Sequence, residues 1–196
     1  MSQYEERTKV CPSCKREIGY YETTCSYCRQ ELEVAFDDAR GLYIKENVGT
    51  YLRKFAKLEG KQGKTGWNWC SFLFGSNWMF YRKMYKEGLF FLFVPEIITW
   101  ISYLLIPAGD KAAFVAVCLN FILTLALWIA TGLFGDYWYK RKVEALVVEG
   151  NGLDDAGKAA LAKRKGGTSG LMIILSMVIG LVLGAITMGI EGMLGL

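Results

Sequence analysis

Two pairs of cysteines near the N-terminus constrain the fold of this chain more than any other feature. Each pair has the spacing C-x-x-C, with Cys11 and Cys14 in the first and Cys25 and Cys28 in the second. Two thiolates in one tight turn can bind the same ion, and the intervening residues suffice to fold back and complete a tetrahedral site. The spacing therefore predicts a small zinc ribbon over residues 1–40, with Zn²⁺ bound by all four sulfurs.

The alternative for these cysteines is a pair of disulfides, which would require an oxidising compartment. The first ten residues carry charge and contain no apolar stretch typical of a secretory signal, so the sequence does not indicate export of this segment. A four-thiolate shell also leaves no open coordination position for water or substrate. We therefore expect the metal to be structural.

The rest of the chain has the composition of a membrane protein. Hydrophobic residues make up 53% of the sequence, above the roughly 45–50% of an average soluble domain, and they are concentrated after residue 66. Three stretches are close to the ~20 apolar residues that cross a bilayer as a helix. They are Gly88–Ile106, Ala112–Phe134 and Leu171–Ile190. The sequence predicts an α-helical integral membrane protein with about three transmembrane helices.

The distribution of basic residues predicts the orientation of these spans. Of the 23 Lys and Arg residues, only Lys111 lies in the turn between the first two spans. Basic residues near helix ends resist translocation, so the N-terminus is expected in the cytoplasm and the C-terminus outside. This orientation also keeps the four cysteines in the reducing compartment. The predicted location is a cell membrane, with the lipid bilayer as the first partner.

An aromatic segment, residues 67–87, precedes the first predicted span. Its apolar part is shorter than a span and has basic residues at both ends, so we expect a re-entrant or interfacial segment on the cytoplasmic side. A fourth span is the alternative. Tryptophan rings favour the headgroup level, and four are predicted to act as interface anchors. They are Trp67, Trp69, Trp78 and Trp138.

An amphipathic basic helix is predicted over residues 41–66, between the zinc ribbon and the aromatic segment. Its apolar residues recur at helical spacing while lysines and arginines occupy other faces. The apolar residues are Val48, Tyr51, Leu52, Phe55 and Leu58. This face could lie on anionic lipid, or it could pack on the zinc ribbon or loops of the same chain. The sequence leaves both arrangements open.

Two predicted spans form a hairpin over 88–138, and the third follows in 171–196. The connection between them, 139–170, contains many glycines and charges and is predicted to be a flexible cytoplasmic loop with one short helix near its end. In the last span, Ser176, Gly180 and Gly184 are small residues at four-residue spacing. Such a face favours close helix packing, within the chain rather than in a homo-oligomer, although the sequence leaves a homo-oligomer open.

One ionisable residue, Glu96, lies inside a predicted span and directly follows Pro95. An unpaired charge at this depth is costly, so the residue is either functional or hydrogen-bonded between helices. Asn120 and Thr124 on the second span are the expected hydrogen-bond donors. The two interpretations are a proton- or cation-linked site and a structural contact between helices, and we expect the structural contact.

Three motifs resemble an uncharacterised family of small bacterial inner-membrane proteins, filed as a domain of unknown function and often carrying an N-terminal zinc ribbon. The motifs begin at Tyr43, Trp67 and Phe134, and the most distinctive is the W-N-W…F-G-x-x-W…Y-R-K-M-Y block that starts at Trp67. The block usually has proline where Ser76 stands, which leaves a helix break at this position open. The resemblance implies a fold and a location but no activity.

Catalysis has little support in this sequence, and we expect that the protein is not an enzyme. The chain has no histidine, the commonest general acid-base, and no phosphate-binding glycine loop. Three functions remain. The favoured one is a membrane-anchored adaptor whose zinc ribbon binds a protein partner. The alternatives are a small transport component that uses Glu96 and membrane-tethered nucleic-acid binding, which the acidic residues of the ribbon disfavour.

Overall fold

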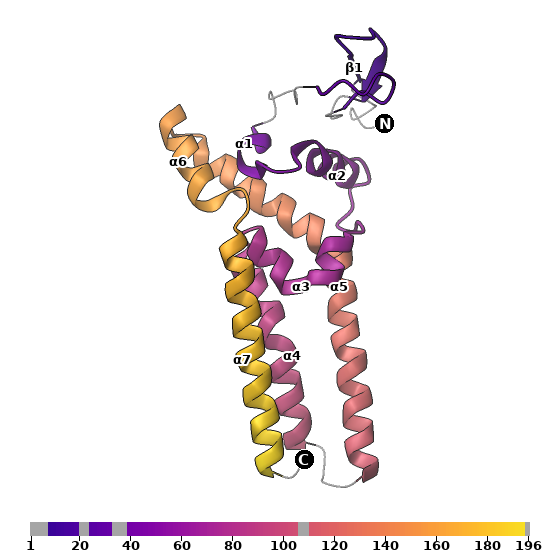
Figure 1. The fold of residues 1–196 in the computed structure, drawn as a ribbon, viewed down its shortest axis with the longest axis vertical. Helices are drawn as coiled ribbons and strands as arrows, with labels where there is room; N and C mark the ends of the chain where they lie inside the picture. The colour runs from indigo at the N-terminus through magenta and orange to yellow at the C-terminus, as the bar shows by residue number, and fades with distance from the viewer. Residues whose placement is uncertain (1–7, 20–23, 33–38, 106–109, 195–196) are drawn as a thin grey trace. The chain divides into compact units, whose positions relative to one another are not determined.

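The computed structural model describes residues 8–19, 24–32, 39–105 and 110–194. It divides the chain into two compact units, each made of two separate sequence segments. Unit 1 comprises Met1–Gly66 and Asp136–Thr168, and unit 2 comprises Trp67–Gly135 and Ser169–Leu196. The described residues are mostly helical, with a short hairpin close to the N-terminus (Figure 1).

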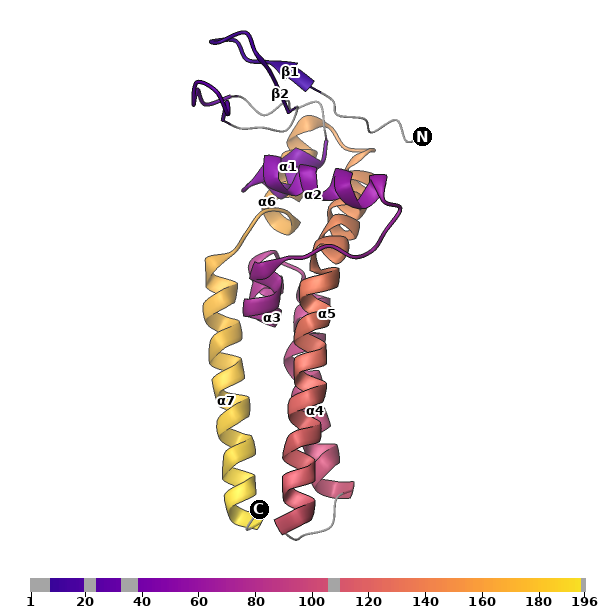
Figure 2. The same ribbon diagram turned by 90° about the vertical axis from the view of Figure 1, so that its right-hand side faces the viewer.

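The N-terminal head, described at residues 8–19 and 24–32, contains both strands found in the described part of the chain. β1 (Thr8–Val10) pairs antiparallel with β2 (Glu17–Gly19), with Lys9 opposite Ile18 (Figure 2). The first C-x-x-C pair forms the connection between these strands. Thr24 and Glu31 form an isolated antiparallel bridge on either side of the second pair. Both cysteine pairs therefore lie in tight turns closed by backbone pairing.

Unit 1 also contains α1 (Arg40–Ile44), α2 (Val48–Gly60), α6 (Asp155–Lys165) and the C-terminal end of α5 (Asp110–Gly150). The five apolar residues predicted on α2 are all buried. The Tyr139 ring from α5 lies against two of them, with ring centroids 4.9 Å from Tyr51 and 5.8 Å from Phe55. The apolar face of α2 thus packs on protein, which answers a question that the sequence left open.

The part of α5 that packs on α2 lies in a segment for which the prediction was wrong. Residues 139–170 were expected to be a flexible loop, but α5 continues to Gly150 and α6 occupies most of the remainder. Tyr139, Val143 and Leu146 recur at helical spacing and are buried, so a charged surface conceals an apolar face in this segment. The short helix expected near the end of the loop corresponds to α6, which begins after Asp154, whose side chain accepts a hydrogen bond from the Gly157 N–H.

Unit 2 consists of α3 (Trp69–Tyr81), α4 (Tyr85–Leu105), the first part of α5 and α7 (Gly170–Leu194). α3 contacts both α4 and α7, and α4 contacts α7 (Figure 1). Two helical stretches are long and apolar enough to cross a membrane, judged by length and composition. They are Phe114–Gly150 in α5 and Asp155–Gly189, whose apolar part is α7. A third span, over α4, stays a prediction.

The aromatic segment forms a helix that is broken in the middle. Gly75 has φ 47° and ψ −119°, a backbone conformation that interrupts α3 and that residues with a side chain rarely adopt. The sequence left a helix break at Ser76 open, and the structure places the break at the preceding residue, Gly75. The segment therefore does not continue as one straight helix, as a fourth span would require.

α3 begins where the chain crosses α5 very closely. Asn68 caps α3 by accepting a hydrogen bond from the Ser71 N–H at 3.0 Å, and its own N–H donates to the Gly132 carbonyl at 2.9 Å. Thr131 Oγ1 donates to the Ser71 carbonyl at 2.9 Å. A Cβ at Gly135 would overlap the Ser71 side chain. This crossing, the α3–α5 junction, depends on the absence of a side chain at Gly135.

The four predicted interface anchors differ in exposure. Trp67 and Trp69 are 40% and 64% exposed, and their rings pack edge to face with centroids 5.1 Å apart. Trp138 is half-buried. Trp78, in contrast, is only 5% exposed, because it lies inside unit 2 near Gly135. The prediction that Trp78 is an interface anchor is therefore wrong.

A candidate metal centre and buried polar contacts

The two cysteine pairs of the head have the same local geometry. In each, the N–H of the residue after the second cysteine donates to the carbonyl of the first, from Lys15 to Cys11 and from Arg29 to Cys25, both at 2.9 Å. Lys15 and Arg29 both have φ 58°, in the left-handed region. Each turn thereby directs its two sulfurs to the same side of the backbone. The two C-x-x-C segments thus form two equivalent turns, which we call knuckles.

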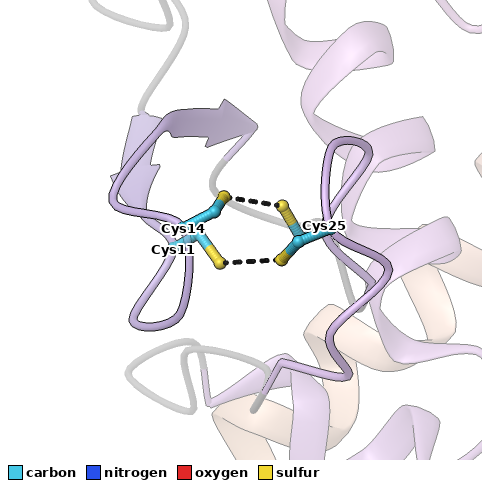
Figure 3. A group of neighbouring side chains, drawn as sticks. Cys11, Cys14 and Cys25 are labelled. Carbon is cyan, nitrogen blue, oxygen red and sulfur yellow. Dashed lines mark hydrogen bonds between the residues drawn. The ribbon is translucent and has the colours of Figure 1, made fainter.

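The four sulfurs converge on one point. All lie within 4.8 Å of one another, and the sulfur–sulfur distances between knuckles are 3.6 Å for Cys11 with Cys28 and 3.6 Å for Cys14 with Cys25 (Figure 3). Zinc–thiolate bonds of about 2.3 Å place the sulfurs of a tetrahedron about 3.8 Å apart. A disulfide would need about 2.05 Å. The four cysteines are free and could hold a metal ion.

Backbone N–H groups lower the pKa of two of these thiols and so favour the thiolate form that binds a cation. The Cys14 N–H donates to the Cys11 sulfur and lowers the pKa of the Cys11 thiol to about 6. The Cys28 N–H lowers the pKa of the Cys25 thiol in the same way. The Arg16 N–H lowers the pKa of the Cys14 thiol, but desolvation and the other three sulfurs outweigh it and raise that pKa to about 11. A divalent cation would replace the remaining protons.

The hydrophobic core of the head is very small. Its buried members are Cys11, Ile18 and Cys25, with Cys14 and Leu32 partly buried against them. Most of these residues are the ligand cysteines themselves. A chain segment of this size buries little apolar surface, and a metal ion held by the four sulfurs would stabilise its fold.

The knuckles also carry exposed apolar side chains. Tyr27 in the second knuckle is 58% exposed, and the Arg16 guanidinium lies over its ring, 4.8 Å from the centroid. Val10, which precedes the first knuckle, is also 58% exposed. Tyrosine and arginine are enriched among the residues that dominate binding at protein interfaces, so this exposed pair is a candidate contact surface.

The intramembrane polar site predicted around Glu96 has a different partner from the one expected. Thr187 Oγ1, from α7, donates to Glu96 Oε2 at 3.0 Å. Asn120 instead accepts from Ser102 Oγ at 3.4 Å and joins α4 to α5. Thr124 is half-buried, and among the described residues it makes no hydrogen bond to Glu96. The prediction that Asn120 and Thr124 donate to Glu96 is therefore wrong, because the helix that packs on this face of α4 is α7.

The small residues predicted in the last span lie in three different environments. Ser176 is buried, and its Oγ lies 2.7 Å from Asn77 Oδ1 of α3. A Cβ at Gly180 would lie 3.8 Å from Leu92 of α4, whereas a Cβ at Gly184 would meet nothing within 4 Å. Packing within the chain thus uses Ser176 and Gly180 but not Gly184.

Sequence analysis missed Thr187 and the α3–α5 junction, although both left a signal. Thr187 follows Ser176 by about three helical turns, so both lie on the same face of α7. Ser71 and Thr131, which meet at the junction, precede two similar segments, Leu73–Trp78 and Leu133–Trp138. The similarity of these segments marks a place where two helices pack, which periodicity alone does not reveal.

A scan against protein-family models matches residues 32–144 to DUF2628, a protein family of unknown function. The matched region covers more than half of the chain. This chain belongs to the DUF2628 family. The search of curated proteins and the search of solved structures each found no match.

The DUF2628 region contains α1 to α4 and most of α5, including the whole α3–α5 junction. Its W-N-W and F-G motifs supply the junction: Asn68 caps α3, and Gly135 lets Ser71 approach α5. The four cysteines lie before the matched residues. These motifs therefore account for a close contact in unit 2, and the cysteine cluster that could hold a metal lies outside the family match.

Proposed function

We propose that this protein is a membrane-anchored adaptor whose N-terminal zinc ribbon binds a protein partner in the cytoplasm. The anchor consists of three transmembrane helices in a bacterial inner membrane, with the N-terminus inside and the C-terminus outside. The observation that carries the proposal is the four-sulfur cluster, because its donors all belong to the protein and leave no position for chemistry. The centre is then structural and not catalytic.

The choice of zinc rests on the chemistry of the donors. Four thiolates in tight knuckles with tetrahedral spacing favour zinc over hard cations such as calcium or magnesium, which prefer oxygen. Lys15, Arg16 and Arg29 lie beside the ligands in sequence and offset the negative charge of a four-thiolate centre. Iron with four sulfurs has similar geometry, and metal analysis distinguishes the two.

The proposed binding surface of the ribbon is the exposed part of its knuckles. Tyr27 and Val10 offer apolar area, and Arg16 adds a charge that stacks on the Tyr27 ring. Aromatic and arginine side chains of this kind dominate the binding energy of protein interfaces. The partner we infer is a cytoplasmic protein with an acidic and apolar surface.

A crosslinking experiment tests this function. The tagged full-length protein is crosslinked in cells, and its partners are compared with those of Tyr27→Ala and of Cys14→Ser with Cys25→Ser. Both variants should lose the same partner, while Gln30→Ala, an exposed substitution in the same knuckle, should keep it. A partner retained by the double cysteine variant would contradict an adaptor role for the ribbon.

Transport through Glu96 is the second candidate, and its contacts favour a structural role instead. The carboxylate accepts a hydrogen bond from Thr187, so it joins α4 to α7 within one chain. Hydrogen bonds of this kind hold membrane helices together. We therefore infer that Glu96 is a helix contact. Loss of a transport phenotype in a normally folded Glu96→Gln variant would reverse this inference.

A further inference from the structure

α2 has two chemically different faces. Its apolar face is buried, as described above, and its opposite face carries Arg53 and Lys57, with the C-cap residue Lys61 next in line; all three are exposed and are spaced four residues apart. Residues at this spacing lie in a row along one side of a helix. We call these three residues the basic strip.

The basic strip differs in its partners from five other basic residues of unit 1. Those five form ion pairs with carboxylates: Arg40 with Glu59, Lys54 with Asp136, Lys140 with Glu59 and Glu144, Lys158 with Asp155, and Lys165 with Glu149. Within the part of the chain that the structure describes, no carboxylate pairs with the basic strip. The Nε of Arg53 donates instead to the Gly49 carbonyl of its own helix at 3.3 Å.

The positive charges of the basic strip repel one another, and a bound anion would reduce this repulsion. Like charges four residues apart on a helix destabilise it, whereas a glutamate in place of one lysine would stabilise it. The apolar face of α2 cannot insert into a membrane because it is already buried. Any ligand of the exposed face must therefore bind by charge.

We propose that the basic strip binds the headgroups of anionic phospholipids. Two features of the chain favour a lipid surface over other anions. Trp67 and Trp69, 40% and 64% exposed, come three to eight residues after Lys64 and Lys61 in the sequence, and exposed tryptophans near basic residues in sequence are typical of the headgroup region. The chain also contains helices apolar enough to cross a membrane. Each basic residue near an anionic membrane surface contributes about 1 kcal/mol.

Lysine footprinting of the full-length protein tests the proposal without any substitution. The protein is reconstituted in nanodiscs of phosphatidylcholine alone or with phosphatidylglycerol, and exposed lysines are acetylated with a water-soluble reagent. Labelling of Lys57 and Lys61 should slow about fivefold with phosphatidylglycerol, as ~1 kcal/mol per residue implies, and recover at high salt. Lys158 and Lys163 on α6, both outside the strip, are the internal controls and should not change.

A matched pair of variants distinguishes an effect of the basic strip from a general effect of positive charge. The variant Arg53→Gln, Lys57→Gln, Lys61→Gln removes the strip, and Lys158→Gln, Lys163→Gln, Arg164→Gln removes the same charge from α6. Phosphatidylglycerol should raise the melting temperature of wild type and of the α6 variant by several degrees, but not that of the strip variant.

Two results would overturn the proposal. One is an equal change at all four lysines, or an equal loss in both variants, since either would mean a general charge effect. The other is protection of Lys57 and Lys61 by single-stranded DNA in phosphatidylcholine nanodiscs without any effect of phosphatidylglycerol, which would make the strip a nucleic-acid surface. Because neither measurement involves the cysteine cluster, the result is independent of the adaptor function.

Discussion

The N-terminal head and the helical unit 2 are each stabilised by a different kind of interaction. Among the described residues of the head, the buried core consists of Cys11, Ile18 and Cys25, so two of its three members are cysteines of the cluster that could hold a metal. Unit 2 has many apolar side chains, but α5 and α7 expose most of theirs. Its helices are joined instead by close backbone approach and by side-chain hydrogen bonds, as at Gly135 and Thr187. The comparison indicates that the head depends on its cysteine cluster and unit 2 on close helix contacts, and that a large hydrophobic core is not the main support of either region.

Removing the metal should have the largest effect and should separate the two regions. A strong chelator, or Cys25→Ser, should unfold the head, since structural zinc contributes on the order of 10 kcal/mol to the folding of small domains. Hydrogen exchange should show loss of protection at 8–32 and no change in α3 to α5. Loss of protection in both regions would show that the contrast is false.

Metal binding by the head should also weaken at low pH. Ligand thiols must lose their protons, and the Cys11 thiol, whose pKa is lowered to about 6, is already ionised at neutral pH. As the pH falls through about 6, Cys11 becomes protonated, so the metal has one more proton to displace and its affinity should fall more steeply. Competition with a metal indicator between pH 5 and 8 measures this change.

The next largest effect is expected at the α3–α5 junction. Gly135→Ala places a methyl group against the Ser71 side chain and should destabilise unit 2 by about 1–3 kcal/mol. Gly184→Ala is the matched control, because a Cβ there meets nothing within 4 Å. Thermal unfolding in detergent compares the two. Equal stability of both variants would mean that close approach does not hold this unit together.

A smaller effect is expected from the contact between α4 and α7. Thr187→Val keeps the shape of the side chain but removes the hydrogen bond to Glu96, which should cost about 0.6–1.7 kcal/mol. Thr124→Val, on α5, is the matched control and should have little effect. The same unfolding measurement serves for both. A larger loss from Thr124→Val would restore the pairing that the sequence suggested.

The smallest effect should be a gain in the head. Lys15 has φ 58°, so Lys15→Gly removes backbone strain and should strengthen metal binding by up to about 1 kcal/mol, or several-fold. Lys15→Ala removes the same charge without relieving the strain, and it should not strengthen binding. Metal affinity by competition distinguishes them. A gain in both variants would attribute the effect to charge.

Local features were predictable from the sequence, and partners distant in sequence were not. The cysteine cluster follows from spacing within two short turns, so the four ligands were found correctly as a group that could hold a metal. The buried face of α2 was also visible in its helical periodicity. In both cases the signal lies within a few neighbouring residues.

The errors all concern tertiary contacts. Trp78 was expected at a membrane interface because its ring is amphipathic, but packing near Gly135 buries it. Glycines and charges between 139 and 170 suggested a loop, although the apolar residues beneath them pack on α2. The hydrogen-bond donors of Glu96 were expected on the neighbouring predicted span, whereas Thr187 donates to it from α7. Composition cannot tell which helix covers a given face.

The most direct test of the central claim is the metal content and coordination of the purified full-length protein. Elemental analysis should give one zinc ion per chain, and X-ray absorption should give four sulfur ligands at about 2.3 Å. Cys14→Ser with Cys25→Ser should remove the metal. A wild-type protein without stoichiometric metal, or with oxygen or nitrogen ligands, would contradict the claim that four thiolates bind a metal ion and so stabilise the head.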